Sequence, residues 1–213
     1  MRWILTCLAW FLALVILMPA TATAATVVKL DMPNLVASSD AIVVAEVTEI
    51  DSELDADGRV YTTIEFSTDD VLKGEPGESF SIRQVGGQHG DIATRAPGMP
   101  DFERGEEVFL FLSNFETHPV ITGLSQGKFR VAVGPDDETR FVVPQLHGVH
   151  LVDPKDAPRQ AAPGGDEATD ELQVQAPPFD MSSHAEVFRQ VHEFGAFRQQ
   201  VEVTIEAQRE ESR

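Results

Sequence analysis

Residues 41–67, AIVVAEVTEIDSELDADGRVYTTIEFS, contain the pattern that decides the fold. The stretch begins as a continuous apolar run and becomes alternating, and from Val60 onwards apolar and polar side chains alternate again. A period of two is typical of a β-strand with one face in the core. Asp57-Gly58 lies between the two runs and is a hairpin signal, because these residues tolerate the positive φ angles of a tight turn. The stretch therefore predicts two antiparallel strands joined by a turn.

Further runs of the same kind follow, separated by Gly, Pro and Asp turns, at residues 80–82, 107–112, 119–122, 128–133 and 139–143. No helical run separates them, so we expect residues 25–152 to form an antiparallel barrel or sandwich. Of these we favour an OB-like Greek-key β-barrel. Asp31 and Pro33 predict a short helix before the first strand, with Asp31 as the N-cap and the proline in the first turn. The predicted fold class is therefore mainly β.

The last part of the chain differs in composition from the predicted barrel. Residues 153–180 are rich in Pro, Gly and Ala, which predicts a flexible linker. We expect residues 181–213 to form an amphipathic helix, because a capping box begins at Ser183 and apolar side chains recur at helical spacing, namely Val187, Val191, Phe194, Phe197, Val201 and Ile205. Residues 201–205 suit a strand as well, so the far end stays open. The helix either captures a partner or packs on the barrel, which we favour because soluble proteins rarely expose such a stripe.

Residues 1–24 have the features of a secretory signal. Arg2 precedes an apolar run that ends at Pro19, and Ala22 and Ala24 supply the small residues of a cleavage site. We therefore expect Ala25 as the mature N-terminus and a periplasmic or extracellular location. An uncleaved membrane anchor is the alternative, but the run is shorter than the ~20 apolar residues that span a bilayer. The single cysteine, Cys7, lies within this segment, so the mature chain would fold without a disulfide.

The charge of the chain limits its partners. Without the signal, 15 Lys and Arg stand against 35 Asp and Glu, which gives a net charge of about −20 with neutral histidines. Such a surface repels phosphate backbones and anionic lipid headgroups. The composition therefore argues against nucleic-acid binding and against stable membrane association after signal cleavage. It favours solubility, cations or a basic patch on a partner.

One motif of the chain imitates a catalytic signature. Residues 123–127, GLSQG, match the G-x-S-x-G nucleophile elbow of serine hydrolases, with Ser125 as the nucleophile and His147 or His150 as the base. An elbow needs a strand before the serine and a helix after it. Here the alternating run KFRVAV follows, at residues 128–133. We therefore interpret the glycines as turn or bulge positions and keep the hydrolase as an alternative.

Candidate metal ligands are sparse. Residues 53–58, ELDADG, imitate the start of a calcium loop, but position twelve is Ile64 where an EF-hand needs a glutamate, so the sequence predicts weak Ca²⁺ binding at most. His147 and His150, followed by Asp153, have a spacing that brings two imidazoles near one metal, but a site needs three or four ligands. We expect neither a metal site nor a cofactor.

A glycine-rich loop is the best candidate for binding. Gly86, Gly87 and Gly90 surround Gln88 and His89, and three glycines beside an exposed imidazole suggest a backbone shaped for close approach. A tight turn at a barrel corner explains the same residues. The sequence does not separate these two interpretations.

Several of these segments together resemble a known family. The order SDAIVVAEV (residues 39–47), VLKG (71–74), FERGEEVFLFL (102–112) and GLSQGKF (123–129) is similar to the netrin module and tissue inhibitor of metalloproteinases type of OB-fold barrel, in a cysteine-free form like uncharacterised exported bacterial proteins. The resemblance implies an OB fold and an interaction with a peptidase. Inhibitors of that type chelate zinc through an N-terminal cysteine, whereas this mature chain would begin at Ala25. Inhibition by that route is therefore not expected.

We therefore expect a non-enzymatic, exported binding or accessory protein with a protein partner. The partner would be an exported peptidase, as the resemblance implies, or another periplasmic or extracellular protein. Two alternatives stay open: a small serine hydrolase that uses Ser125, and a structural envelope or carrier protein without a discrete site.

Overall fold

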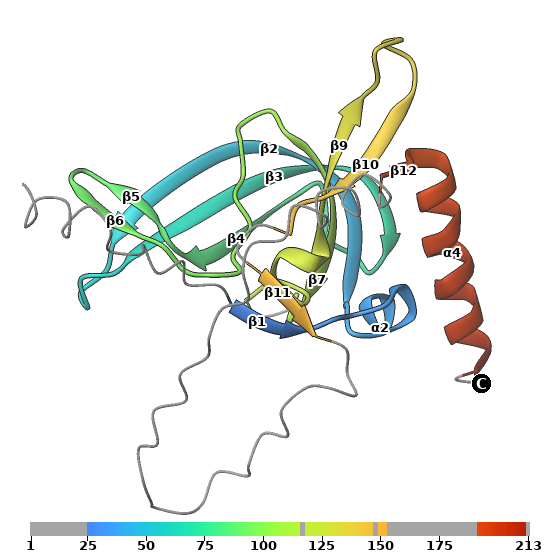
Figure 1. The fold of residues 1–213 in the computed structure, drawn as a ribbon, viewed down its shortest axis with the longest axis horizontal. Coiled ribbons are helices and arrows are strands. Elements are labelled where there is room, and N and C mark those ends of the chain that lie inside the picture. Colours follow the sequence, from blue (N-terminus) through green and yellow to red (C-terminus); the bar gives the residue numbers. More distant parts are fainter. Residues whose placement is uncertain (1–24, 116–117, 147–148, 153–190, 212–213) are drawn as a thin grey trace, which may run out of the picture.

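A computed structural model describes residues 25–115, 118–146, 149–152 and 191–211 (Figure 1). The strands are β1 (Ala25–Val28), β2 (Ala41–Leu54), β3 (Val60–Lys73), β4 (Ser79–Val85), β5 (Gly87–His89), β6 (Ile92–Thr94), β7 (Glu107–Ser113), β8 (Val120–Ile121), β9 (Lys128–Val133), β10 (Arg140–Pro144), β11 (Val149–Val152) and β12 (His192–Glu193). The helices are α2 (Met32–Ala37), the 3₁₀ turn η1 (Leu124–Gly127) and α4 (Phe194–Glu211). The mainly β class, with a short helix before the sheet and a longer one after it, is confirmed.

Eight strands form one antiparallel sheet. Its order is β12-β10-β9-β7-β2-β3-β4, and β8 pairs with β7 beside β9. Among the described residues no strand pair closes this sheet into a barrel. A gap of about 360 Å³, lined by residues of β4 and β8 together with Met99, lies where these two strands would have to pair. The sheet is therefore open, where the sequence predicted a barrel.

Both faces of the central strands are buried. On one face, Ile42 and Val44 of β2 join Phe109 and Phe111 of β7 in a cluster with α2 and α4. On the other face, the intervening residues of the same strands, such as Val43, join a second cluster with β3 and β4. A strand covered on both sides has no polar face, which explains why residues 41–45 form a continuous apolar run.

Helix α4 packs on its own sheet, as we favoured from the sequence. Phe197, Val201 and Ile205 are buried in the first cluster, and the Phe197 ring lies edge-on to Phe109 with centroids 5.1 Å apart. The start of the helix was predicted wrongly, because His192–Glu193 pair with β10 and the helix begins only at Phe194. Residues 201–205 are helical. The linker, the capping box and the secretory signal lie outside the described residues.

Two local predictions are also confirmed. The Asp31 carboxylate accepts a hydrogen bond from the Asn34 amide at 2.9 Å and caps α2, which ends at Ala37. Gly58 has a φ of +73° and turns the chain between β2 and β3. No helix in the described ranges is both long and apolar enough to cross a membrane.

Candidate functional site

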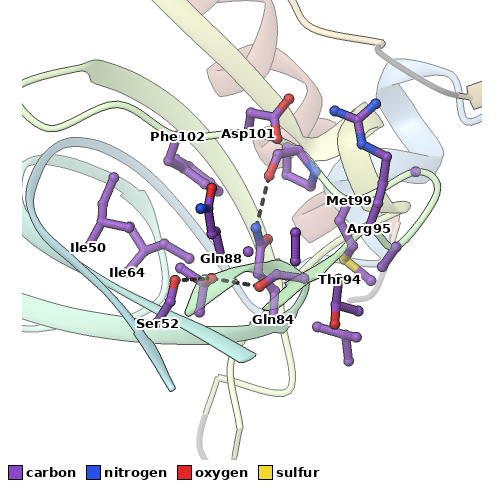
Figure 2. Close-up of a pocket in the computed structure, with 18 of the residues that line it drawn as sticks. Ile50, Ser52, Ile64, Gln84, Gln88, Thr94, Arg95, Met99, Asp101 and Phe102 are labelled. Atoms are coloured by element: carbon purple, nitrogen blue, oxygen red, sulfur yellow. Dashed lines mark hydrogen bonds between the residues drawn. The ribbon is translucent and has the colours of Figure 1, made fainter. Parts of the chain in front are cut away.

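A pocket of about 500 Å³ lies between the sheet and residues 86–102 (Figure 2). Ile50, Ile64, Met99 and Phe102 are among its apolar lining residues. Its neutral polar lining residues include Ser52, Thr62, Gln84 and Gln88. The pocket thus combines apolar surface with hydroxyl and amide groups, which is the usual composition of a ligand-binding site.

Two glycines bring the chain close to the sheet at one wall of this pocket. Gly87 has a φ of +123°, and a Cβ there would lie 2.1 Å from the Thr62 hydroxyl oxygen. That hydroxyl donates to the Gly86 carbonyl at 2.6 Å and lies 2.8 Å from the Ser52 hydroxyl. Only glycine fits this close approach, because any side chain would displace the hydroxyl pair.

The glycine-rich loop predicted from the sequence divides into two parts. Gly86, Gly87 and Gln88 line the pocket. The exposed side chain of His89 lies outside the lining and contacts the Ser52 carbonyl through Nδ1 at 2.7 Å, and Gly90 turns the chain between β5 and β6 with a φ of +58°. Figure 1 shows this hairpin beside the ends of β2 and β3, away from α4.

The second wall, residues 95–102, was not recognised from the sequence. Three carbonyl groups of this segment accept hydrogen bonds from three different elements. The Gly98 carbonyl accepts from the Ser125 amide of η1 at 3.0 Å, and the Pro100 carbonyl accepts from the Gln84 side-chain amide of β4 at 2.9 Å. The Asp101 carbonyl accepts from the Lys128 amine of β9. The segment is therefore fixed against the sheet without a ligand.

Lys128 is the most deeply buried member of this arrangement, and its side chain is fully excluded from solvent. Its amine donates to both carboxylate oxygens of Glu106, at 3.0 and 2.9 Å, and to Gln145 at 2.8 Å. It also lies 4.2 Å from the centre of the Phe102 ring. Burial lowers the pKa of Lys128, and the hydrogen bond and charge of Glu106 oppose this shift. The amine thus joins the pocket wall to β9.

The GLSQG segment has a structural role in this fold. Ser125 is fully buried in η1, its hydroxyl has no hydrogen-bond partner among the described residues, and β9 rather than a helix follows. The Gln126 side chain accepts from the Leu30 amide at 2.9 Å and donates to the Val28 carbonyl at 3.0 Å. It thereby ties β1 to η1. His147 lies outside the described residues, and His150 is described only as a member of β11.

The acidic turn after β2 does not gather its carboxylates. Glu53 makes an ion pair with Arg83 at 2.9 Å, and Asp55 accepts from the Ala56 amide at 2.8 Å. Within the described ranges, no three His, Cys, Asp or Glu side chains lie together as a metal site would require.

No known protein family, curated protein or solved structure matches the chain. The likeness to the netrin module therefore stays a prediction from the residues.

Proposed function

We propose that the chain is a non-enzymatic, exported binding protein that holds part of a protein partner in the pocket formed by β2–β4 and residues 86–102. The observation that carries the proposal is the fixed pocket wall, since Gly98, Pro100 and Asp101 are each held by a separate element. A preformed pocket binds without the entropic cost of ordering its own loop.

The lining suits a polypeptide. Hydroxyl and amide groups match the donors and acceptors of a peptide backbone, while the half-buried Ile50 and Phe102 supply contacts for an apolar side chain. The large excess of acidic residues in the chain argues against nucleic acids and anionic membranes as partners. The features of residues 1–24 support action in the periplasm or outside the cell.

The test compares partner capture by the wild type and by pocket variants. Gly87→Val places a side chain against the Ser52–Thr62 hydroxyl pair, and Gln88→Trp fills the pocket without straining the glycine. Gly58→Asn is the matched control, because Gly58 also has a positive φ but no atom lies within 4 Å of a Cβ there. Each purified protein is immobilised and exposed to the extracytoplasmic fraction of the source culture.

We expect at least one polypeptide that the wild type and Gly58→Asn retain and both pocket variants lose. Equal retention by all four proteins would contradict the proposal, as would the absence of any retained polypeptide, which a structural envelope protein without a site would give. Thermal unfolding of each variant separates loss of binding from loss of fold.

An exported peptidase is the partner class that we propose first. Peptide hydrolysis by the retained partner, measured with and without the protein, tests this part. Inhibition by the wild type but not by Gln88→Trp would support it. Unchanged hydrolysis would restrict the proposal to another extracytoplasmic protein.

A further inference from the structure

We infer that the pocket recognises the carboxy-terminal residue of a polypeptide with an apolar last side chain. This inference rests on the proposed binding function and adds the chemistry that the partner must present. Three features of the lining carry it: a cation without an ion pair, a buried acceptor without a donor, and an apolar side.

The cation is Arg95, which lines the pocket, is exposed and makes no ion pair with any residue that the structure describes. Six of the ten other Lys and Arg side chains in the described ranges pair with carboxylates, namely Arg83, Arg104, Lys128, Arg130, Arg140 and Arg198. Arg95 is the only basic side chain among the described residues that line the pocket. In so acidic a chain, an unpaired guanidinium at a pocket is available for an incoming carboxylate, which it can bind through two parallel hydrogen bonds. Asp101, the other charged side chain of the lining, makes no ion pair with it.

The acceptor is the side-chain carbonyl oxygen of Gln84. It is buried and unpartnered within the described part of the chain, whereas the amide nitrogen of the same side chain donates to Pro100 at 2.9 Å. A buried acceptor without a donor destabilises the free protein. The oxygen is shielded from solvent in the free pocket, so a ligand N–H gains this hydrogen bond once the Gln84 side chain turns towards it.

The apolar side of the pocket is formed by the half-buried Ile50 and Phe102, with the fully buried Ile64 behind them. Figure 2 shows these side chains and Arg95 at opposite sides, with the Gln84 side chain between them. An apolar group, an N–H donor and a carboxylate occur together in the last residue of a polypeptide. A fatty acid lacks the N–H, and an internal peptide segment lacks the terminal carboxylate.

Three probes test this assignment by calorimetric titration of the protein purified after export. They are N-acetyl-alanyl-alanyl-leucine, its C-terminal amide, and decanoate. We expect saturable binding of the free acid, with at least about tenfold weaker binding of the amide and of decanoate. Arg95→Gln should weaken binding of the free acid about tenfold and leave binding of the amide unchanged. Arg209→Gln, on the exposed side of α4, is the matched control and should change neither affinity.

The inference is overturned if the free acid does not bind, if acid and amide bind equally, or if decanoate binds as tightly as the peptide. Its failure differs from failure of the binding function. Partner capture that Gln88→Trp abolishes but Arg95→Gln leaves intact would retain the function and remove the carboxylate from it.

Discussion

Lys128 connects segments of the chain that lie far apart in the sequence. Its buried amine contacts the Glu106 carboxylate, the Asp101 carbonyl and the Gln145 side chain, so one residue holds the pocket wall on β9. Removing one member of a buried ion pair leaves the other as an uncompensated charge, and this commonly costs about 3–5 kcal/mol. Breaking the Lys128–Glu106 pair should therefore cost more stability than breaking an exposed ion pair.

We predict that Lys128→Met lowers the free energy of unfolding by about 3–5 kcal/mol in urea titrations. The buried Glu106 carboxylate then keeps only the Glu103 amide at 3.1 Å and the half-exposed Arg130 guanidinium at 4.0 Å to offset its charge. The double variant Lys128→Met/Glu106→Leu should recover most of this loss, because both charges are absent. A loss below about 1 kcal/mol in the single variant would show that the pair is not buried as described.

Lys128 also makes the free energy of unfolding depend on pH. Burial lowers the pKa of Lys128 in the folded protein below its ordinary value of 10.5, despite the opposing effect of Glu106. At a pH between the lowered pKa of the folded protein and 10.5, Lys128 is protonated in the unfolded chain but not in the folded one. Its contribution therefore makes unfolding less favourable as the pH rises. We expect the stability difference between wild type and Lys128→Met to increase as the pH rises towards the ordinary lysine value of 10.5. A decrease over this range would mean that the pKa is raised.

Ser125 discriminates the binding function from the hydrolase alternative. The side chain is fully buried, and β9 follows η1 directly, so we expect no covalent labelling by a serine-directed fluorophosphonate. Mass spectrometry of the treated protein measures this. Stoichiometric labelling of Ser125 in the folded wild type, absent in Ser125→Ala, would support the hydrolase.

At the level of elements, α4 depends on a few buried side chains. Phe197 is 2 % exposed and packs on Phe109 and Phe129, whereas Val203 on the same helix is 58 % exposed. We predict that Phe197→Ala costs about 3–5 kcal/mol in chemical unfolding, the usual penalty for removing a buried aromatic ring. Val203→Ala should change stability by less than about 0.5 kcal/mol. Similar effects of both changes would contradict the docking of this helix on the sheet.

The elements that the sequence predicts are those with their own periodicity. β2, β3, β7 and β9 follow from alternation or from a continuous apolar run, and α2 follows from the Asp31 cap. Short strands such as β1 and β12 were missed, because two to four residues have no measurable period and pair with distant partners. The predicted helix wrongly included residues 192–193. Their helical spacing is a local signal, and pairing with the distant strand β10 overrides it.

The candidate site was only half predictable. The pair Gly86-Gly87 predicted a close approach of the backbone from the sequence alone. The structure agrees, because both residues have positive φ angles that few other residues adopt. Nothing local marks residues 95–102 as a pocket wall. Their positions depend on hydrogen bonds from Gln84, Ser125 and Lys128, which only the folded sheet brings together.

At the scale of the whole molecule, the helices and the candidate site lie on opposite faces of the sheet. One face of the sheet is covered by α2 and α4 (Figure 1). The pocket lies on the other face, because its lining residues Ile50, Ile64 and Phe102 belong to the second cluster or pack against it. A partner can therefore contact residues 86–102 without displacing the helix. This separation allows binding and stability to be changed independently, as the variants of Gln88 and Phe197 are designed to do.

Site-specific photo-crosslinking in the exporting cells tests the central claim most directly. A benzophenone amino acid is placed at position 88 in the pocket or at position 203 on the exposed side of α4, and crosslinked products are identified by mass spectrometry. We predict a discrete crosslinked polypeptide from position 88 and none from position 203. Crosslinks from position 203 alone, or none from position 88, would contradict a binding site in this pocket.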